Sequence, residues 1–308
     1  MKSTLYLVFI YLMIGSCGYD ADKPYNDTPT SGKVSIAADE TLMPIAKAQL
    51  DTFHGLYRYA AIKMHYKSES ALFKALIDDS VKVVMSARKL NKEEKAYFKS
   101  RNLVPAEIKV AIDALAIIIN KNNPDSLLKM AQLKMILQGK ISSWKEINKQ
   151  SGLGDISFVF DQNGSSTVRY LKDSLMEGLT FPPNCFAANS GKDVIDYVEK
   201  NKNAIGVIGV SWISDVDDAA VKEFLSRVTI VGMGSDFAAG PGDYYKPYQA
   251  YIALNQYPLT REVYMINREG RAGLGTGFVS FVAGDQGQRI IRLLGMLPAT
   301  MPVRIVKI

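Results

Sequence analysis

Three short loops of this sequence carry hydroxyl side chains where an oxyanion could bind. Each loop follows an apolar run and opens a helical pattern: Asp39-Glu40-Thr41, Ser86-Ala87-Arg88 and Asn163-Gly164-Ser165-Ser166-Thr167. The first turn of a helix has unpaired N–H groups and a partial positive charge, so hydroxyl and backbone donors there can bind an anion together. Helix capping explains any one of these loops better than a ligand does. Their recurrence favours an anion-binding protein.

The elements that must position these loops alternate short apolar strands with helical patterns, which is typical of an α/β fold with mostly parallel strands. In open α/β sheets, the loops at the carboxyl ends of the strands form the ligand crevice. The sequence predicts strands at 34–38, 81–85, 114–119, 156–160, 204–210 and 248–254. It predicts helices at 42–53, from about 91, at 125–138, after 167 and at 278–294.

Composition excludes several classes of protein. The 308 residues suffice for about two domains and a sizeable core. The net charge of +6 favours anions, but the charges are scattered and form no basic stripe, so we expect no nucleic-acid partner. The chain has only two His and two Cys, which argues against most zinc sites and any iron–sulfur cluster, and we expect no metal and no cofactor.

The N-terminus is typical of an export signal. Residues 1–16 combine a charged start with a short apolar stretch, and Ile14-Gly15-Ser16-Cys17 resembles the lipobox of bacterial lipoproteins. We therefore predict a signal peptide at 1–16, lipidation of Cys17 and a flexible tether at 17–32. The alternative is an ordinary signal peptide with a coincidental cysteine. Cys185 is then expected to be a buried, small apolar residue rather than a nucleophile.

From about Val34 to the C-terminus, a series of strings matches one family in order and spacing. They are Ala38-Asp39-Glu40-Thr41-Leu42, Met85-Ser86-Ala87-Arg88, Ala111-Ile112-Asp113-Ala114-Leu115, Gly139-Lys140-Ile141-Ser142-Ser143-Trp144, Gly164-Ser165-Ser166-Thr167, Ala204-Ile205-Gly206-Val207-Ile208-Gly209, Tyr257-Pro258-Leu259-Thr260-Arg261 and Gly287-Gln288-Arg289. In these strings the chain resembles the PstS-like family, the periplasmic phosphate-binding proteins of ABC-type phosphate importers.

The resemblance implies a two-lobed periplasmic-binding-protein fold of type II, with a ligand cleft between the lobes. Two crossing strands, expected at 113–120 and 248–255, would form the hinge. Lobe 1 would comprise 33–118 and 248–308, and lobe 2 would comprise 119–247.

The resemblance also implies a function without chemistry: a monomeric, lipid-anchored receptor would bind inorganic phosphate and pass it to the membrane permease of an ABC importer. The implied ligand donors are Thr41, Leu42, Ser86, Ser165, Ser166 and Thr167. Asp113 would accept the proton of hydrogen phosphate and reject sulfate, which has none at neutral pH. Capping of a strand end is the simpler alternative role for Asp113.

The sequence departs from the family at Asp161. The family has an arginine four residues before the first serine of its Gly-Ser-Gly-Thr loop, so a carboxylate here reverses the local charge. Arg88 is our favoured replacement, since a loop residue can turn inward, and Arg169 is the second possibility. Asp161 could instead pair with one of these arginines.

Two other functions stay open. The first is the same fold with another oxyanion, or with a role as a phosphate sensor or surface lipoprotein. The second is an exported hydrolase, because Gly209-Val210-Ser211-Trp212-Ile213 has half of a nucleophile elbow. His54 and His65 lie far from the loops in sequence and are expected to be surface or packing residues.

Overall fold

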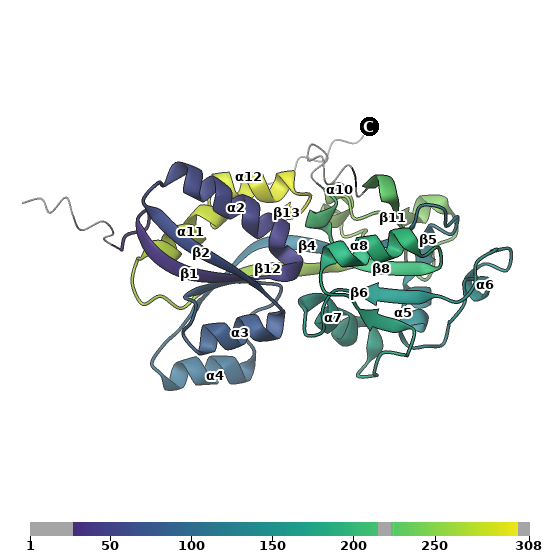
Figure 1. Cartoon of the computed structure of the whole chain (residues 1–308), viewed down its shortest axis with the longest axis horizontal. Coiled ribbons are helices and arrows are strands. Elements are labelled where there is room, and N and C mark those ends of the chain that lie inside the picture. Colours follow the sequence, from purple (N-terminus) through teal and green to yellow (C-terminus); the bar gives the residue numbers. More distant parts are fainter. Residues whose placement is uncertain (1–26, 215–222, 224, 301–308) are drawn as a thin grey trace, which may run out of the picture.

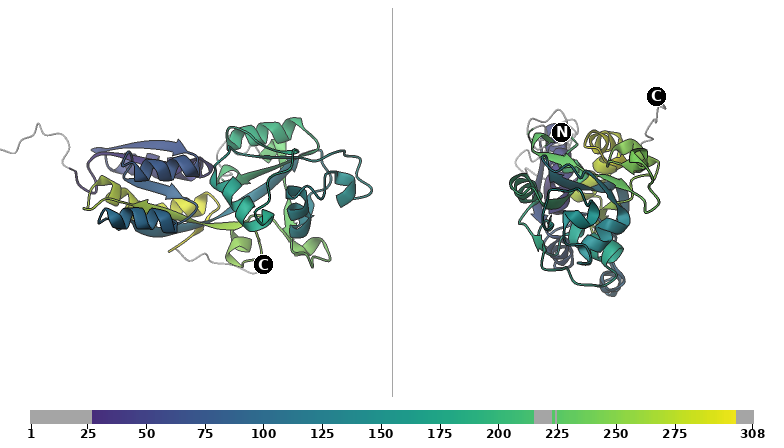
Figure 2. Two further views of the ribbon diagram at one scale, coloured as in Figure 1. Left: turned by 90° about the horizontal axis from the view of Figure 1, so that it is seen from below. Right: turned by 90° about the vertical axis from the view of Figure 1, so that its right-hand side faces the viewer.

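The structure is a computed structural model that describes residues 27–214, 223 and 225–300. Its elements form two groups along the long axis of the molecule (Figures 1 and 2). Within the described residues, one ten-stranded sheet runs through both groups. Its main path is β2 (Ala60–Lys67), β1 (Gly32–Asp39), β3 (Val83–Ser86), β12 (Thr260–Asn267), β4 (Ala106–Asn120), β8 (Ala204–Gly209), β6 (Ser157–Phe160) and β7 (Cys185–Ala187).

Strand β4 connects the two groups because it changes partners along its length. Its residues up to Ala114 pair with β12, and from Leu115 onward they pair with β8. We call β2, β1, β3 and β12 the first half-sheet, and β8, β6 and β7 the second. Two short strands, β9 (Val228–Ile230) and β13 (Leu297–Pro298), also pair with β4, while β5 (Leu127–Lys129), β10 (Gly232–Gly234) and β11 (Tyr244–Tyr245) form a separate small sheet.

Helices cover both faces of each half-sheet (Figure 1). Around the first half-sheet, α2 (Met43–Leu56), α11 (Leu274–Ala283) and α12 (Asp285–Leu293) lie on one side, and α3 (Glu69–Ile77) and α4 (Lys92–Ser100) lie on the other. Around the second half-sheet, α8 (Gly191–Lys200) lies on one side, and α5 (Met130–Leu137) and α7 (Ser166–Leu171) lie on the other. The remaining helical segments are η1 (Glu40–Leu42), α6 (Trp144–Ile147), η2 (Lys172–Met176), η3 (Val210–Trp212), η4 (Pro241–Asp243) and α10 (Gln249–Ala253).

The central part of β4 has no face toward solvent. Its residues from Ala114 to Ile119 are fully buried and belong to a hydrophobic core that also includes side chains of both half-sheets. Burying an Ile or Leu side chain contributes about 1.5–3 kcal/mol, so this stretch anchors both groups to one strand. Such a continuous apolar run is expected for a strand covered on both faces.

Most of the predicted elements are confirmed, including the capping box formed by Asn91 and Glu94 at the start of α4. The strand predicted at 248–254 is wrong, because this segment forms α10 and the strand is β12, which follows it. The helix predicted at 125–138 begins only at Met130, since the residues before it form β5. The long helix predicted at 278–294 is divided into α11 and α12 at Gly284, whose backbone is extended.

No helix among the described residues is long and apolar enough to cross a membrane. The predicted signal peptide and Cys17 lie outside the described residues. Cys185, at the start of β7, is a partly buried free thiol, and burial raises its pKa to about 12. A thiol held protonated in this way is a poor nucleophile.

Candidate functional site

The strand directions bring the predicted loops to the middle of β4. Strands β1 and β3 are parallel to each other, and β12 runs antiparallel to both β3 and β4. Strands β6 and β8 are parallel to each other, and β8 is antiparallel to β4. The carboxyl ends of β1 and β3 therefore approach from one side and those of β6 and β8 from the other, which makes the middle of β4 the crevice of both half-sheets.

Arg261, the second residue of β12, joins residues from both sides of this crevice. Its guanidinium group forms an ion pair with Asp113 of β4, with Nε and Nη2 at 2.9 and 2.8 Å from Oδ2. Nη1 donates to Ser166 Oγ at 2.8 Å, and Nη2 donates to Thr41 Oγ1 at 2.9 Å. The Thr41 and Ser166 hydroxyls are themselves 3.0 Å apart. All four side chains are buried.

Asp161 accepts the hydroxyl groups of the third loop. Oδ1 accepts a hydrogen bond from Ser165, and Oδ2 accepts one from Thr167 at 3.0 Å. Ser165 is also the N-cap of α7, since its Oγ accepts from the N–H of Val168. Burial raises the pKa of Asp161 to about 7, although the hydrogen bond from Ser165 acts in the opposite direction; the charge of Asp39 adds to the rise.

Asp39 is the third buried carboxylate of the crevice. It is the last residue of β1 and the N-cap of η1, and its Oδ1 accepts from the N–H of Thr41 at 2.9 Å. Its other oxygen, Oδ2, is buried without a hydrogen-bond partner among the described residues, and so is Oδ1 of Asp113. Burial raises the pKa of Asp113, while the ion pair with Arg261 lowers it. Unpaired buried carboxylate oxygens are costly, which suits a site that receives a hydrogen-bond donor from a ligand.

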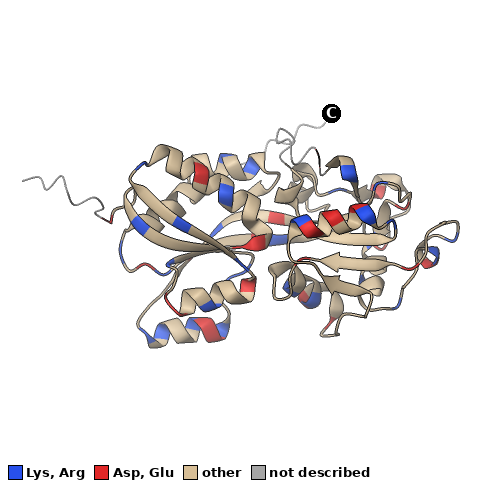
Figure 3. Cartoon of the chain, in the orientation of Figure 1, with Lys and Arg blue, Asp and Glu red and all other residues tan. Residues whose placement is uncertain are grey.

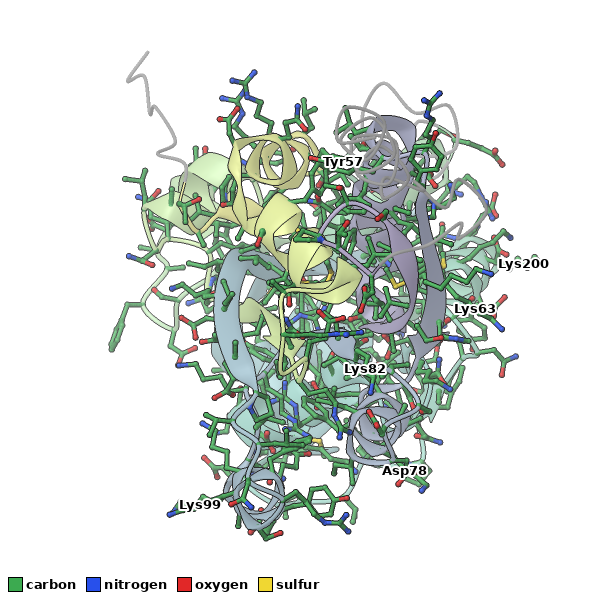
Figure 4. The ribbon with its side chains drawn as sticks, turned by 90° about the vertical axis from the view of Figure 1, so that its left-hand side faces the viewer. Tyr57, Lys63, Asp78, Lys82, Lys99 and Lys200 are labelled. Atoms are coloured by element: carbon green, nitrogen blue, oxygen red, sulfur yellow. The ribbon has the colours of Figure 1, made fainter. Side chains whose placement is uncertain are left out.

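The crevice is negatively charged. Asp39, Asp113 and Asp161 face one guanidinium group, that of Arg261, whose pKa is raised by all three carboxylates against the opposing effect of burial. On the rest of the described chain, Lys and Arg alternate with Asp and Glu along both groups of elements (Figure 3). Lysines such as Lys63 and Lys99 project from the periphery (Figure 4). The basic net charge is thus a property of the surface and not of the crevice.

The structure brings six of the eight predicted ligand residues to the crevice directly: Thr41, Asp113, Ser165, Ser166, Thr167 and the fully buried Leu42 beside Thr41. Leu42 is the N-cap of α2 and caps it with no side-chain hydrogen bond. Ser86 is buried at the end of β3, one residue beyond the Ala38–Met85 pair, and its Oγ accepts only from the N–H of Arg88 among the bonds of the described residues.

The structure places Arg88, the eighth, elsewhere. Its guanidinium group forms two hydrogen bonds with Glu94, at 2.7 and 2.8 Å, and one with Glu69 at 3.2 Å, and it stacks on the ring of Phe73. Two carboxylates and an aromatic face thus hold it away from Asp161. Arg169 also binds Glu69, at 2.6 Å, so neither arginine pairs with Asp161. The positive charge comes instead from Arg261.

Glu69 connects the two groups of elements, because it lies on α3 and Arg169 lies on α7. Arg169 also donates to the carbonyl of Ala87 at 3.2 Å, and the N–H of Ser70 donates to the carbonyl of Gly164 at 3.3 Å. Gly164 has a φ of +82°, and a Cβ at this position would lie 2.8 Å from the Ser70 hydroxyl.

A pocket of about 540 Å³ opens between α3 and α7. Glu69 and Arg88 line it on the first side, and Ser165 and Arg169 line it on the second. Since Ser165 also binds Asp161, this pocket reaches the edge of the buried crevice. A small solute could approach the crevice from here.

Sequence reasoning missed Arg261 and Asp39 as site residues, although both stood in the matching strings. The signal for Arg261 was an arginine at the start of a run that reads as a buried strand, because a buried arginine requires carboxylate or hydroxyl partners. That run was not recognised, since the strand was expected some ten residues earlier.

The hydrolase alternative gains no support from the geometry. Ser211 is buried, and no base among the described residues forms a hydrogen bond with its Oγ. His54 instead accepts from the N–H of Ile62 at 3.3 Å. The described residues also contain no group of His, Cys, Asp and Glu side chains that could hold a metal ion.

Comparison with known proteins identifies the family of this chain. The family model of the PBP superfamily domain matches residues 23–286. This chain belongs to the PBP superfamily. Among curated proteins, a PBP relative called phosphate-binding protein PstS, from Staphylococcus aureus, is 23% identical over 282 residues, which cover 90% of this chain and 81% of the relative.

Solved structures share the fold. A protein with bound phosphate from Clostridium perfringens has a TM-score of 0.72 and 23% identity, covering 87% of this chain and 100% of the other. An ABC-type phosphate transport receptor from Vibrio cholerae has a TM-score of 0.62 and 19% identity, with coverages of 87% and 100%. The two-lobed, type II periplasmic-binding-protein fold expected from the sequence is thereby confirmed.

Proposed function

We propose that this chain is a solute-binding protein that binds inorganic phosphate between its two lobes and delivers it to the permease of an ABC importer, as a monomer and without chemistry. Its PBP family, and relatives named for phosphate binding, support this function. The observation that carries the proposal is the buried constellation of Arg261, Thr41 and Ser166 beside Asp113. One guanidinium group and two hydroxyls are donors suited to an oxyanion.

Asp113 supports phosphate rather than sulfate as the anion. Its Oδ1 is buried and makes no hydrogen bond within the described residues, so it can accept the O–H group of a ligand. Hydrogen phosphate supplies an O–H group, whereas sulfate at neutral pH would bring only lone pairs against the carboxylate. An unpaired acceptor of this kind costs about 1–3 kcal/mol, and charge repulsion adds to the cost.

Calorimetric titration of the ligand-stripped protein with phosphate and with sulfate near pH 7 tests the proposal. We expect micromolar or tighter binding of phosphate and no heat with sulfate. Asp113→Asn should weaken phosphate binding about 10- to 100-fold and reduce the preference over sulfate, because an amide can donate to either anion. No heat with phosphate, from a protein with normal circular dichroism, would rule out phosphate capture.

Asp125→Asn is the matched control for this variant. Asp125 also accepts two side-chain hydrogen bonds, from Asn148 at 2.6 Å and Ser151 at 2.7 Å, but it follows the far end of β4. Its replacement should leave both titrations unchanged.

The charge of the crevice supports a second candidate ligand, a protonated oxyanion other than inorganic phosphate. Three carboxylates against one guanidinium group disfavour a doubly charged anion and favour a singly charged one. Titrations with arsenate and with a phosphate monoester separate the candidates. Tighter binding of either than of phosphate would reassign the solute while keeping the role of a receptor.

We also propose that the chain is exported and held at a membrane of the cell envelope through a lipid on Cys17. The lipobox-like string before Cys17 supports this location. A receptor held near the membrane surface remains close to its permease.

A further inference from the structure

Asp161 occupies the hydroxyl donors that an anion in the third loop would need. Both of its oxygens are used, Oδ1 by Ser165 and Oδ2 by Thr167. A bound oxyanion is an acceptor of the same kind, so it competes with the Asp161 carboxylate for the same two hydrogens. Protonation of Asp161 weakens its hydrogen bonds to the two hydroxyl groups, because a neutral carboxyl group is a poorer acceptor and also a donor.

The surroundings of Asp161 also disfavour a second negative charge. It faces Asp39 at the end of β1 and Arg261 on β12, and Arg261 is in turn shared with Asp113 of β4. From α7, Tyr170 lies near the same guanidinium group and stays protonated, because burial raises the pKa of its hydroxyl. A doubly charged anion would therefore be placed among three carboxylates with one cation to offset them.

We propose that Asp161 makes this site select phosphate together with one extra proton, so that the bound species is singly charged dihydrogen phosphate or its equivalent, hydrogen phosphate beside a protonated Asp161. This inference rests on the proposed function and deepens it. One O–H group of the ligand meets the free Oδ1 of Asp113, and the second proton lies between the ligand and Asp161. At alkaline pH, the complex therefore forms from hydrogen phosphate, the protein and one proton taken up from solution.

The pH dependence of phosphate binding tests this inference on the unmodified protein. Above pH 7.5, free phosphate and free Asp161 are both mostly deprotonated, so binding must take up one proton from solution. The phosphate Kd should then rise with pH, approaching tenfold per pH unit between 8 and 9. Calorimetry at pH 8 in buffers of different ionisation enthalpy should report the uptake of about one proton.

The variant Asp161→Asn tests the contribution of the Asp161 charge to the pH dependence of phosphate binding. The amide has nearly the same shape and no charge, so it should bind phosphate more tightly than the wild type at pH 9, about 10- to 100-fold, with a flatter pH profile and little proton uptake. Asp125→Asn, the control defined above, should keep the wild-type profile. Circular dichroism at each pH verifies that all three proteins are folded.

The possible outcomes separate the two proposals. A wild-type Kd that is constant from pH 7 to 9, with no buffer-dependent heat, would overturn the role of Asp161 and leave phosphate capture intact. An Asp161→Asn profile as steep as that of the wild type would do the same. Absence of phosphate binding at every pH would overturn phosphate capture and this inference with it.

Discussion

Arg261 shows why a single side chain can hold a site together. The planar guanidinium group binds three partners at once: a carboxylate on β4 and one hydroxyl from each side of the crevice. Since the Arg261–Asp113 pair is fully buried, loss of either partner leaves an uncompensated charge, at a cost of about 3–5 kcal/mol. Removal of one partner alone is therefore expected to destabilise the folded chain.

Asp161 gives a prediction for stability that needs no ligand. Its pKa is about 7 in the folded chain and about 3.9 in an unfolded one, so the folded state holds a proton that the unfolded state lacks between these values. The resulting stabilisation is complete below about pH 4 and is lost as the pH rises through 7. Relative to Asp161→Asn, the wild type should lose about 2–3 kcal/mol of unfolding free energy between pH 5 and pH 8.

Urea denaturation of both proteins at the two pH values measures this difference. Asp125→Asn serves again as the control for removal of a carboxylate outside the crevice. Parallel pH profiles for the wild type and Asp161→Asn would contradict the raised pKa.

At the scale of elements, α3 and α7 are joined across the pocket by one carboxylate. Glu69 binds Arg169 through both oxygens, at 2.6 and 3.2 Å, and its side chain is only 5% exposed. Glu69→Gln removes the charge and should weaken the contact between the two groups. Trp212 is the natural reporter, because its indole N–H donates to the Thr41 carbonyl at 3.2 Å across the crevice.

We expect Glu69→Gln to shift tryptophan emission to longer wavelength and to increase quenching by acrylamide, since Trp212 becomes exposed. The other tryptophan, Trp144, is fully buried within the second group and should contribute a constant background. Asp173→Asn is the control: it removes the exposed partner of Arg169 on the same side of the pocket. Unchanged emission and quenching in Glu69→Gln would show that this ion pair does not hold the groups together.

The elements that could be predicted are those whose signal is local. The strand before Asp39, the capping box at Asn91 and the loop ending at Thr167 are set by neighbours in sequence. The region near 248–267 could not be predicted in this way, because its alternating aromatic and apolar residues fit a strand as well as a short helix. The strand β12 forms because it pairs with β3 and β4, and these contacts are long-range in sequence.

The parts of the site that could be predicted are likewise those with a local signal. The hydroxyl loops lie where their strands end, as the pattern of strands indicates, whereas Asp113 was expected at the start of a strand and lies in the middle of β4. The cation of the site could not be predicted in this way. Arg88 pairs with Glu94, six residues further along, and Arg261 reaches the crevice only through long-range contacts of the fold. The lobe boundaries stay predictions, and the pairing of β4 supports a first boundary near Leu115.

At the scale of the whole molecule, location depends on Cys17. If this residue carries acyl chains, the protein should partition into the detergent phase of a Triton X-114 separation, because each buried CH₂ group contributes about 0.8 kcal/mol. Cys17→Ser should move it to the aqueous phase without altering phosphate binding. A wild-type protein in the aqueous phase with a free Cys17 thiol would refute lipidation.

The position of β12 between β3 and β4 has a consequence for biosynthesis. Its two neighbours are made long before it, so the ribosome releases them without the strand that joins them. The second half-sheet, whose strands all precede β12 in the chain, can complete its hydrogen bonds first, whereas the first half-sheet stays open until nearly the whole chain has been synthesised.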